Sequence, residues 1–203
     1  MRTLHTEPYR DQLARWPTTG HHILAQSDAE TVVVYQAYQP SIGRFAAEAQ
    51  HFGGGGFSLS RMSWIKPNFL WMMYRSGWGT KEGQEIVLAV WLARAGFEAI
   101  LAGGVPSSFD PARYADRDAW SEAVKQSSVR VQWDPDHAPN GAPVERRAIQ
   151  LGLRGDVLAR YAREWIVEIQ DISPEVAAMR AQLDAGGVAA LVCPREDVFP
   201  ATG

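Results

Sequence analysis

Basic and aromatic side chains gather in one window of the sequence, residues 49–81. The window contains no Asp or Glu, and its basic and histidine residues are His51, Arg61, Lys66, Arg75 and Lys81. It also holds seven aromatic residues, which are Phe52, Phe57, Trp64, Phe69, Trp71, Tyr74 and Trp78. Phosphates and flat bases or pyridine rings are the ligands that suit such a surface. The alternative is a core hairpin and helix whose charges lie scattered in solvent.

The predicted start of a helix lies directly beside one of these cations. Pro67 is typical of a first helical turn, and we expect the helix over Asn68–Arg75. Backbone N–H donors at a helix start attract anions, and here they would lie next to the ammonium group of Lys66. The sequence therefore predicts an anion site around Lys66.

Other motifs argue against several kinds of site. Gly53–Gly56 lacks both the Lys-Ser/Thr of a P-loop and the spacing of a dinucleotide-binding turn, so we interpret it as a hinge or lid. The five histidines show no HExxH or similar spacing, and we expect no metal site. No Ser lies in a G-x-S-x-G motif, and Cys193 lies in the tail, so neither is a candidate nucleophile.

Length and composition bound the class of protein. The chain has 203 residues, of which 46% are hydrophobic and 21% charged, which predicts one folded domain rather than disorder. The formal net charge of −3 gives no chain-wide cationic field for nucleic acid. No apolar run reaches the roughly 18 residues of a membrane helix, and the first residues do not resemble a signal peptide. With a single cysteine and no internal disulfide, we expect a cytoplasmic protein without membrane contact.

Strands and helices are predicted to alternate irregularly along the chain. The predicted strands are Thr31–Tyr35, Phe57–Ile65, Ile86–Leu92, Val129–Trp133, Arg147–Leu153 and Ile166–Ile172. The predicted helices are Pro40–Ala49, Asn68–Arg75, Asp116–Lys125, Asp156–Trp165 and Pro174–Leu183, with a loop over 134–141 and an undecided segment over 96–101. This order favours an α+β fold with a mixed or antiparallel sheet and flanking helices. Within a single domain (1–203) we expect a peripheral N-terminal segment (1–30), a core (31–172) and a C-terminal helix and tail (173–203).

One long motif resembles a known bacterial family. The segment Ser60–Trp78 (SRMSWIKPNFLWMMYRSGW) resembles domain-of-unknown-function family 4291. Thr31–Tyr38, Val129–Pro135 and Glu164–Val167 also match the pattern of that family, and the resemblance extends from about His22 to Ile172. The family name by itself implies no function.

The order of motifs is also remotely similar to DNA-targeting ADP-ribosyltransferase toxins of the DarT type. Those proteins open with a strand that ends in Tyr-His-x-Thr, where this chain has Tyr35–Tyr38. They continue with a Pro-Arg-containing segment and a Gly-Gln step into a strand, where this chain has Lys66–Trp71 and Gly83–Leu88. They end with a catalytic strand, which Arg147–Leu153 resembles. The resemblance implies an ADP-ribosyltransferase-like fold, NAD as substrate, and DNA, RNA or a nucleotide as acceptor.

The chain departs from the toxin pattern at each key position. Gln36 replaces His, Lys66 replaces Arg, and Gln150 replaces Glu, or Ile149 does in a shifted register. Breaking the nicotinamide–ribose bond passes through an oxocarbenium-like state, so a glutamine can position a hydroxyl group there but cannot act as a general base. Transfer would then depend on an acceptor that is already a good nucleophile, such as a base nitrogen.

The resemblance assigns a role to each candidate. Gln150, Lys66 and Gln36 are the catalytic candidates, with Lys66 holding the pyrophosphate and Gln36 bonding the nicotinamide amide or a ribose hydroxyl. Tyr35 or Tyr74 would cover the nicotinamide ring. The NAD-binding candidates together are Tyr35, Gln36, Ala37, Arg61, Lys66, Asn68, Tyr74 and Arg75. Each also has a purely structural interpretation, as a strand, core or helix-capping residue.

Two other functions compete with the enzyme. The same cationic, aromatic groove suits a non-catalytic module that stacks a nucleobase and holds its phosphate. An interaction protein without a small-molecule site is the third interpretation. A carboxylate beside Gln150, from Asp134 or Glu145, would favour the enzyme, and a groove open at both ends would favour the binding module.

Overall fold

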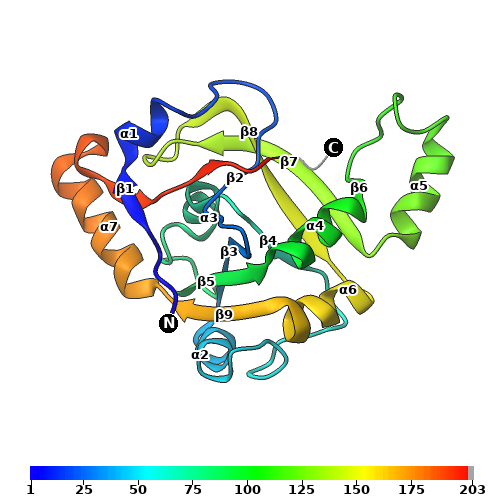
Figure 1. Cartoon of the computed structure of the whole chain (residues 1–203), viewed down its shortest axis with the longest axis horizontal. Helices are drawn as coiled ribbons and strands as arrows, with labels where there is room; N and C mark the ends of the chain where they lie inside the picture. The colour runs from blue at the N-terminus through cyan, green and yellow to red at the C-terminus, as the bar shows by residue number, and fades with distance from the viewer. Residues whose placement is uncertain (201–203) are drawn as a thin grey trace.

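The computed structural model describes residues 1–200, and residues 201–203 of the predicted tail lie outside the described residues. The fold is mixed α+β, as predicted, with antiparallel and mixed sheets and helices around them (Figure 1). The strands are β1 (Thr6–Pro8), β2 (Leu24–Ala25), β3 (Thr31–Tyr38), β4 (Ser63–Ile65), β5 (Ile86–Ala93), β6 (Gly104–Pro106), β7 (Val129–His137), β8 (Pro143–Leu153), β9 (Ile166–Asp171), β10 (Val192–Pro194) and β11 (Asp197–Val198). The helices are α1 (Tyr9–Leu13), α2 (Pro40–Ala49), α3 (Phe69–Ser76), α4 (Arg94–Ala102), α5 (Arg117–Gln126), α6 (Gly155–Arg160, continued by a π-helical turn over Tyr161–Trp165) and α7 (Ser173–Gly186), with a 3₁₀ turn over Val188–Ala190.

The central sheet has three antiparallel strands in the order β3-β5-β9. Its strands β3 and β5 are rich in Val, Ile and Leu, and both of their faces are buried. Successive side chains of a strand point to opposite faces. Val32 and Val34 therefore join one hydrophobic cluster, while Val33 and Tyr35 join another.

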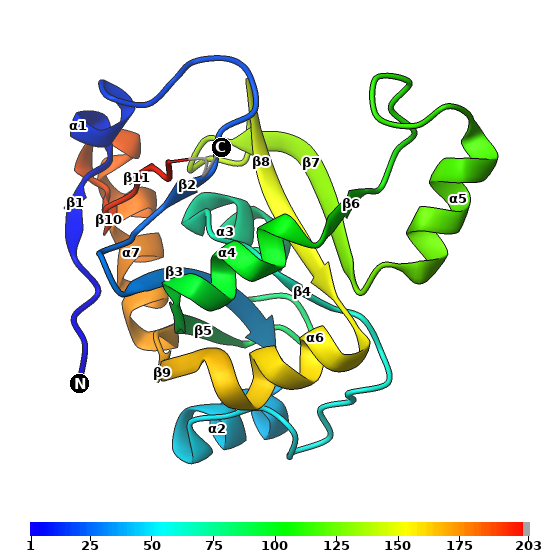
Figure 2. The same cartoon turned by 45° about the vertical axis from the view of Figure 1, so that its right-hand side comes forward.

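A second sheet lies against one face of the first. It has four strands in the order β4-β8-β7-β6, and its long β7–β8 hairpin extends past the central sheet (Figure 2). The first cluster fills the space between the sheets, where Leu88 and Val90 of β5 share a core with Leu151 and Leu153 of β8. Helix α5 projects from the far edge of this sheet and has no buried residue.

Helices and both chain ends cover the other face of the central sheet. The second cluster joins α3 and α7 to β3 and β5, through side chains such as Phe69 and Met179. Strand β1 pairs with β10, and β2 pairs with β11, so the N-terminal segment lies beside the segment over 192–198 (Figure 1). Tyr9 and Trp16 from the segment 1–30, and Leu191 from the tail, are buried in this cluster.

One backbone bridge connects the two sheets. The amide of Tyr35 in β3 donates to the carbonyl of Lys66 at 2.7 Å, and the amide of Lys66 donates to the carbonyl of Tyr35 at 3.2 Å. Lys66 follows β4 directly, so the bridge holds the end of β4 against β3. This position decides where the Lys66 side chain lies.

Several predicted elements differ from the structure in their bounds. Strand β7 continues through Asp134–His137, where a loop was expected, because a buried ion pair between Asp136 and Arg146 ties this segment to β8. The strand predicted over 57–65 is limited to β4. Helix α3 begins at Phe69, one residue later than predicted, because the side chain of Asn68 caps it by accepting a hydrogen bond from the Trp71 amide. Pro67 therefore precedes the helix instead of occupying its first turn. The undecided segment 96–101 is helical, within α4.

No helix within residues 1–200 combines the length and the apolar character that a membrane crossing requires.

Candidate functional site

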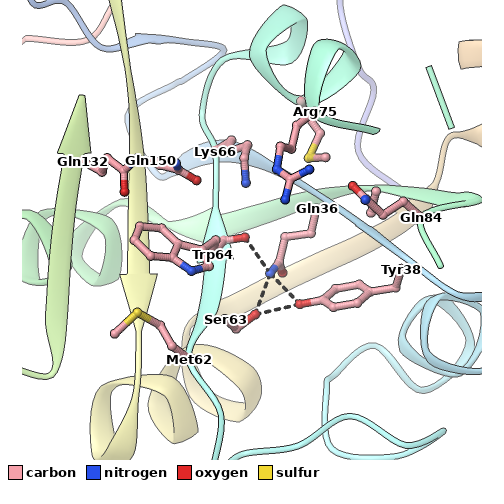
Figure 3. A pocket seen from close by; sticks show the side chains of 12 residues that line it. Gln36, Tyr38, Met62, Ser63, Trp64, Lys66, Arg75, Gln84, Gln132 and Gln150 are labelled. Atoms are coloured by element: carbon pink, nitrogen blue, oxygen red, sulfur yellow. Dashed lines mark hydrogen bonds between the residues drawn. The ribbon is translucent and has the colours of Figure 1, made fainter. Parts of the chain in front are cut away.

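A cavity of about 370 Å³ lies where the two sheets and α3 meet. Its walls come from the ends of β3 and β4, from α3, from the loop before β5, and from the β7–β8 hairpin (Figure 3). The lining residues are Gln36, Ala37, Tyr38, Met62, Ser63, Trp64, Lys66, Met72, Arg75, Gln84, Gln132 and Gln150. Elements far apart in the sequence therefore meet in one polar cavity.

Lys66 is the most buried cation of this cavity, with a relative exposure of 5%. Among residues 1–200, its ammonium group forms no ion pair and no hydrogen bond within the chain. The pKa of Lys66 is lowered to about 8, chiefly by burial and also by the neighbouring Arg75 guanidinium, while the carboxylate of Asp134 acts in the opposite direction. Lys66 is thus an uncompensated positive charge directed into the cavity (Figure 3).

Arg75 adds a second cation beside Lys66. It lies in the last turn of α3, is exposed, and has its guanidinium next to the Lys66 ammonium (Figure 3). Two like charges held together without a neutralising partner repel each other, and a bound anion would relieve that repulsion. No Asp or Glu is among the twelve lining residues. The charge of this cavity therefore favours a ligand with phosphate or carboxylate groups.

The start of α3, expected as the anion-binding helix terminus, is occupied by protein groups instead. Glu196 Oε1 accepts a hydrogen bond from the Phe69 amide at 2.6 Å, and Asn68 Nδ2 donates to Glu196 Oε2 at 3.1 Å. Burial raises the pKa of Glu196 well above its usual range. The helix terminus is thus a structural joint between α3 and the C-terminal segment, and an anion in the cavity would meet the side chains of Lys66 and Arg75 instead.

Gln36 lines the cavity with a side chain whose hydrogen bonds are already made within the protein. Its Nε2 lies 2.7 Å from Tyr38 Oη, 3.0 Å from Ser63 Oγ and 3.1 Å from the Trp64 carbonyl (Figure 3). Its Oε1 accepts a hydrogen bond from Tyr161 Oη at 2.7 Å. Gln36 therefore fixes the wall of the cavity, and the hydroxyl groups of Tyr38 and Ser63 are the groups of this network that line it.

A carboxylate lies directly behind Gln150. The Gln150 Nε2 donates to Asp134 Oδ2 at 2.7 Å, and the Gln132 Nε2 donates to Asp134 Oδ1 at 2.8 Å. Gln132 and Gln150 are partners in the register of β7 and β8, so one carboxylate orients both amides. Because each amide nitrogen is held by Asp134, the two carbonyl oxygens remain to accept hydrogen bonds from a ligand.

The structure brings together five of the predicted site residues. Gln36, Ala37, Lys66, Arg75 and Gln150 all line the cavity. Together they offer cations for an anion and amide oxygens for donor groups, around a volume suited to part of a nucleotide.

Four other predicted residues lie elsewhere. Tyr35 is fully buried in the second cluster, and its hydroxyl has no partner within the described part of the chain. Tyr74 stacks on the ring of His137, with centroids 3.5 Å apart, and does not line the cavity. Asn68 caps α3, and Arg61 lines a neighbouring cavity.

Within residues 1–200, no group of three or more His, Cys, Asp or Glu side chains is arranged to hold a metal ion.

Comparison with protein families assigns the chain to one family. The model of the family described as Domain of unknown function (DUF4291) matches residues 22–199. The chain belongs to this family. No curated protein matches the chain significantly. The matched range of the DUF4291 domain includes every residue that lines the cavity, and also Asp134 and Glu196.

Sequence reasoning missed several lining residues of this DUF4291 domain, namely Tyr38, Met62, Ser63, Trp64, Met72, Gln84 and Gln132. For Gln132, the sequence pattern did indicate a place in the site. Arg130, Gln132 and Asp134 alternate along the strand predicted at 129–133 and place polar groups on one face. Continuing that strand by one residue would have placed Asp134 beside Gln132.

Proposed function

We propose that this DUF4291 protein is an ADP-ribosyltransferase-like domain that binds NAD in the cavity around Lys66 and transfers ADP-ribose to a nucleic acid or nucleotide. One observation carries the proposal: the four sequence segments that resemble the toxin motifs all contribute to the same cavity. Gln36, Lys66, Gln84 and Gln150 come from the first, second, third and fourth segment respectively, and all four line it.

The charges around the cavity support a dinucleotide as the ligand. The unpaired cations Lys66 and Arg75 suit the pyrophosphate, and the arginine adds the planar donor geometry that lysine lacks. The carbonyl oxygens of Gln132 and Gln150 suit donor groups, such as ribose hydroxyls or the carboxamide of nicotinamide. NAD carries all of these groups.

The transfer step requires little from a general base. The bond from ribose C1′ to the nicotinamide nitrogen breaks, and nicotinamide leaves with the electron pair, which removes the charge of its ring. A lone pair of the acceptor forms the new bond to C1′, and any proton on the acceptor atom passes to water. The positive charge that develops on the ribose lies near Gln150, with the carboxylate of Asp134 directly behind it.

A non-catalytic nucleotide-binding module is the second candidate, and one observation favours it. No carboxylate is among the lining residues, and Asp134 acts through Gln132 and Gln150. A protein of this kind would hold NAD or another nucleotide without breaking it.

Mass spectrometry separates the two functions. The protein is incubated with NAD alone, with NAD and single-stranded DNA, and with NAD and RNA. The transferase predicts release of free nicotinamide together with an acceptor heavier by one ADP-ribosyl group. Binding of NAD with neither product would support the module. Lys66→Ala serves as the cavity variant, and Lys125→Ala, on the exposed helix α5, as its matched control.

A further inference from the structure

A second cavity, of about 440 Å³, adjoins the first. Tyr38, Met62 and Ser63 line both cavities, so the two cavities share a border. This border is held in place at its centre, because Tyr38 Oη and Ser63 Oγ lie 2.7 Å apart and both lie within hydrogen-bonding distance of Gln36 Nε2 (Figure 3). A group bound in the second cavity would therefore lie next to a group bound in the first.

Arg61 is the charged residue of the second cavity. No other Arg, Lys, Asp or Glu lines it, and among residues 1–200 the Arg61 guanidinium has no ion pair and no hydrogen bond within the chain. An arginine that lines a cavity without a carboxylate partner offers its full set of donors to an incoming phosphate. The charge of this cavity has the same sign as that of the first.

An aromatic ring and polar groups complete the second cavity. Phe57 is half-buried and stacks on the buried ring of Phe52, with centroids 5.0 Å apart and planes at 29°. Its ring is thereby held in place while it lines the cavity, which is the arrangement on which a base stacks. Ser58 and Gln39 add hydrogen-bonding side chains.

The glycine loop at the rim of this cavity is packed against α2. It includes Gly56, at the end of the glycine run that was interpreted as a hinge or lid. A side chain on Gly54 would overlap the ring of Phe45, and one on Gly55 would overlap the carbonyl of Ser41. Close packing against α2 therefore explains why glycine occupies these two positions, and the loop contacts the helix directly.

We propose that the second cavity binds the acceptor, a nucleoside phosphate whose phosphate contacts Arg61 and whose base stacks on Phe57. This inference rests on the proposed function. It assigns NAD to the cavity of Lys66 and Arg75, and the acceptor to the adjoining cavity of Arg61, which shares Tyr38 and Ser63 with the first. The nucleoside phosphate is either free or part of a single strand, since a duplex would keep its bases stacked away from Phe57.

Binding measurements on Arg61 variants test the assignment. A fluorescein-labelled single strand of about ten nucleotides and the common deoxynucleoside 5′-monophosphates are titrated separately, and NAD is titrated in parallel. Arg61→Ala should weaken binding of the strand or of the monophosphates about three- to tenfold, the loss expected for one partly exposed charged contact. Arg61→Lys keeps the charge but not the planar donors, so its affinity should fall between those of wild type and Arg61→Ala. Arg113→Ala, which removes an exposed arginine paired with Asp110, should retain the wild-type affinity. NAD affinity should be the same in wild type and Arg61→Ala.

The outcomes separate this inference from the proposed function. If Arg61→Ala leaves the affinities for both the strand and the monophosphates unchanged, the acceptor site is overturned, even where NAD binds through Lys66. A loss of NAD affinity equal to the loss of strand affinity would also overturn it, because the second cavity would then hold part of NAD. If NAD does not bind but nucleotide binding depends on Arg61, the proposed function fails, and the second cavity stands as a nucleotide site without the role of acceptor site. Weaker binding of the strand alone identifies the acceptor as a nucleic acid, and weaker binding of the monophosphates alone identifies it as a free nucleotide. Weaker binding of both shows that the site takes a nucleoside phosphate in either form.

Discussion

Gln150 donates a hydrogen bond to Asp134 at 2.7 Å, and the same carboxylate partly offsets the burial that lowers the pKa of Lys66. One acidic residue behind the cavity therefore influences both the amide and the ammonium group that a ligand would meet. It orients Gln150 from β8 through a cross-strand contact, and it acts on Lys66 through charge.

The pH dependence of anion binding tests this dual role. Because the pKa of Lys66 is about 8, the cavity loses one positive charge as the pH rises through that value, and NAD binding should weaken over the same range. Asp134→Asn removes the carboxylate that raises this pKa, so the midpoint should move to lower pH. Titration calorimetry from about pH 6 to about pH 9 measures this midpoint. The control Asp156→Asn, at the exposed start of α6, should leave the midpoint in place, and a midpoint unaffected by Asp134→Asn would contradict the coupling.

The buried ammonium group of Lys66 should destabilise the folded protein, so that replacing Lys66 by an apolar residue should raise the free energy of unfolding. The unfolded chain binds the proton with the ordinary lysine pKa of 10.5, whereas the folded chain releases it at about 8. Folding is therefore penalised below pH 8, and the penalty disappears between pH 8 and 10.5. Lys66→Met should raise the free energy of unfolding at neutral pH by an amount of the order of 3 kcal/mol or less, and the advantage should shrink as the pH rises.

Urea unfolding of wild type and Lys66→Met at neutral and at alkaline pH checks this expectation. Lys125→Met, which replaces an exposed lysine, provides the matched comparison and should show no such pH-dependent difference. A Lys66→Met protein less stable than wild type at neutral pH would show that the ammonium group is compensated.

Gln36 should be a stability residue as well as a wall residue. Gln36→Leu removes the acceptor of the buried Tyr161 hydroxyl and the donor shared by Tyr38, Ser63 and the Trp64 carbonyl. Leaving buried polar groups without partners should lower the free energy of unfolding by about 2–3 kcal/mol. Gln126→Leu, at the exposed end of α5, should change it little, and equal effects of the two variants in urea unfolding would refute the network.

Glu196 should make stability depend on pH in the opposite sense to an ordinary surface carboxylate. Its pKa is raised by burial, so the folded chain holds a proton that the unfolded chain has released above about pH 4.5. The contribution of Glu196 is complete below that pH and is lost as the pH rises toward its raised pKa. Glu196→Gln keeps the neutral form, and its stability relative to wild type should therefore increase from pH 4.5 upward. Thermal unfolding across this range measures the difference, with the exposed Glu175→Gln as control; a constant or decreasing difference would be inconsistent with a buried, protonated Glu196.

Much of the framework was predictable from local sequence. Continuous β-branched and aliphatic runs indicated β3 and β5, and turn residues bounded α2 and α5, because these signals depend on neighbours in the chain. Lys66 and Arg75, two cations of the window, line the same cavity. Strand periodicity, however, argued against placing the side chains of both Tyr35 and Gln36 in one site, since neighbouring residues of a strand face opposite sides.

The remaining features depend on contacts between distant segments. Glu196 reaches the start of α3 from the C-terminal segment, and no local pattern indicates that a carboxylate will occupy that helix terminus. Tyr74 turns toward His137 because β7 continues past Asp134, which the Asp136–Arg146 ion pair enforces. The register that pairs Gln132 with Gln150 is likewise a property of the assembled hairpin.

Isothermal titration of NAD into the wild-type protein and two lysine variants tests the central claim most directly. We expect measurable binding to wild type, an affinity at least about tenfold lower for Lys66→Ala, and wild-type affinity for Lys125→Ala. Absence of heat with wild type, or equal affinities for wild type and Lys66→Ala, would contradict an NAD site at this cavity.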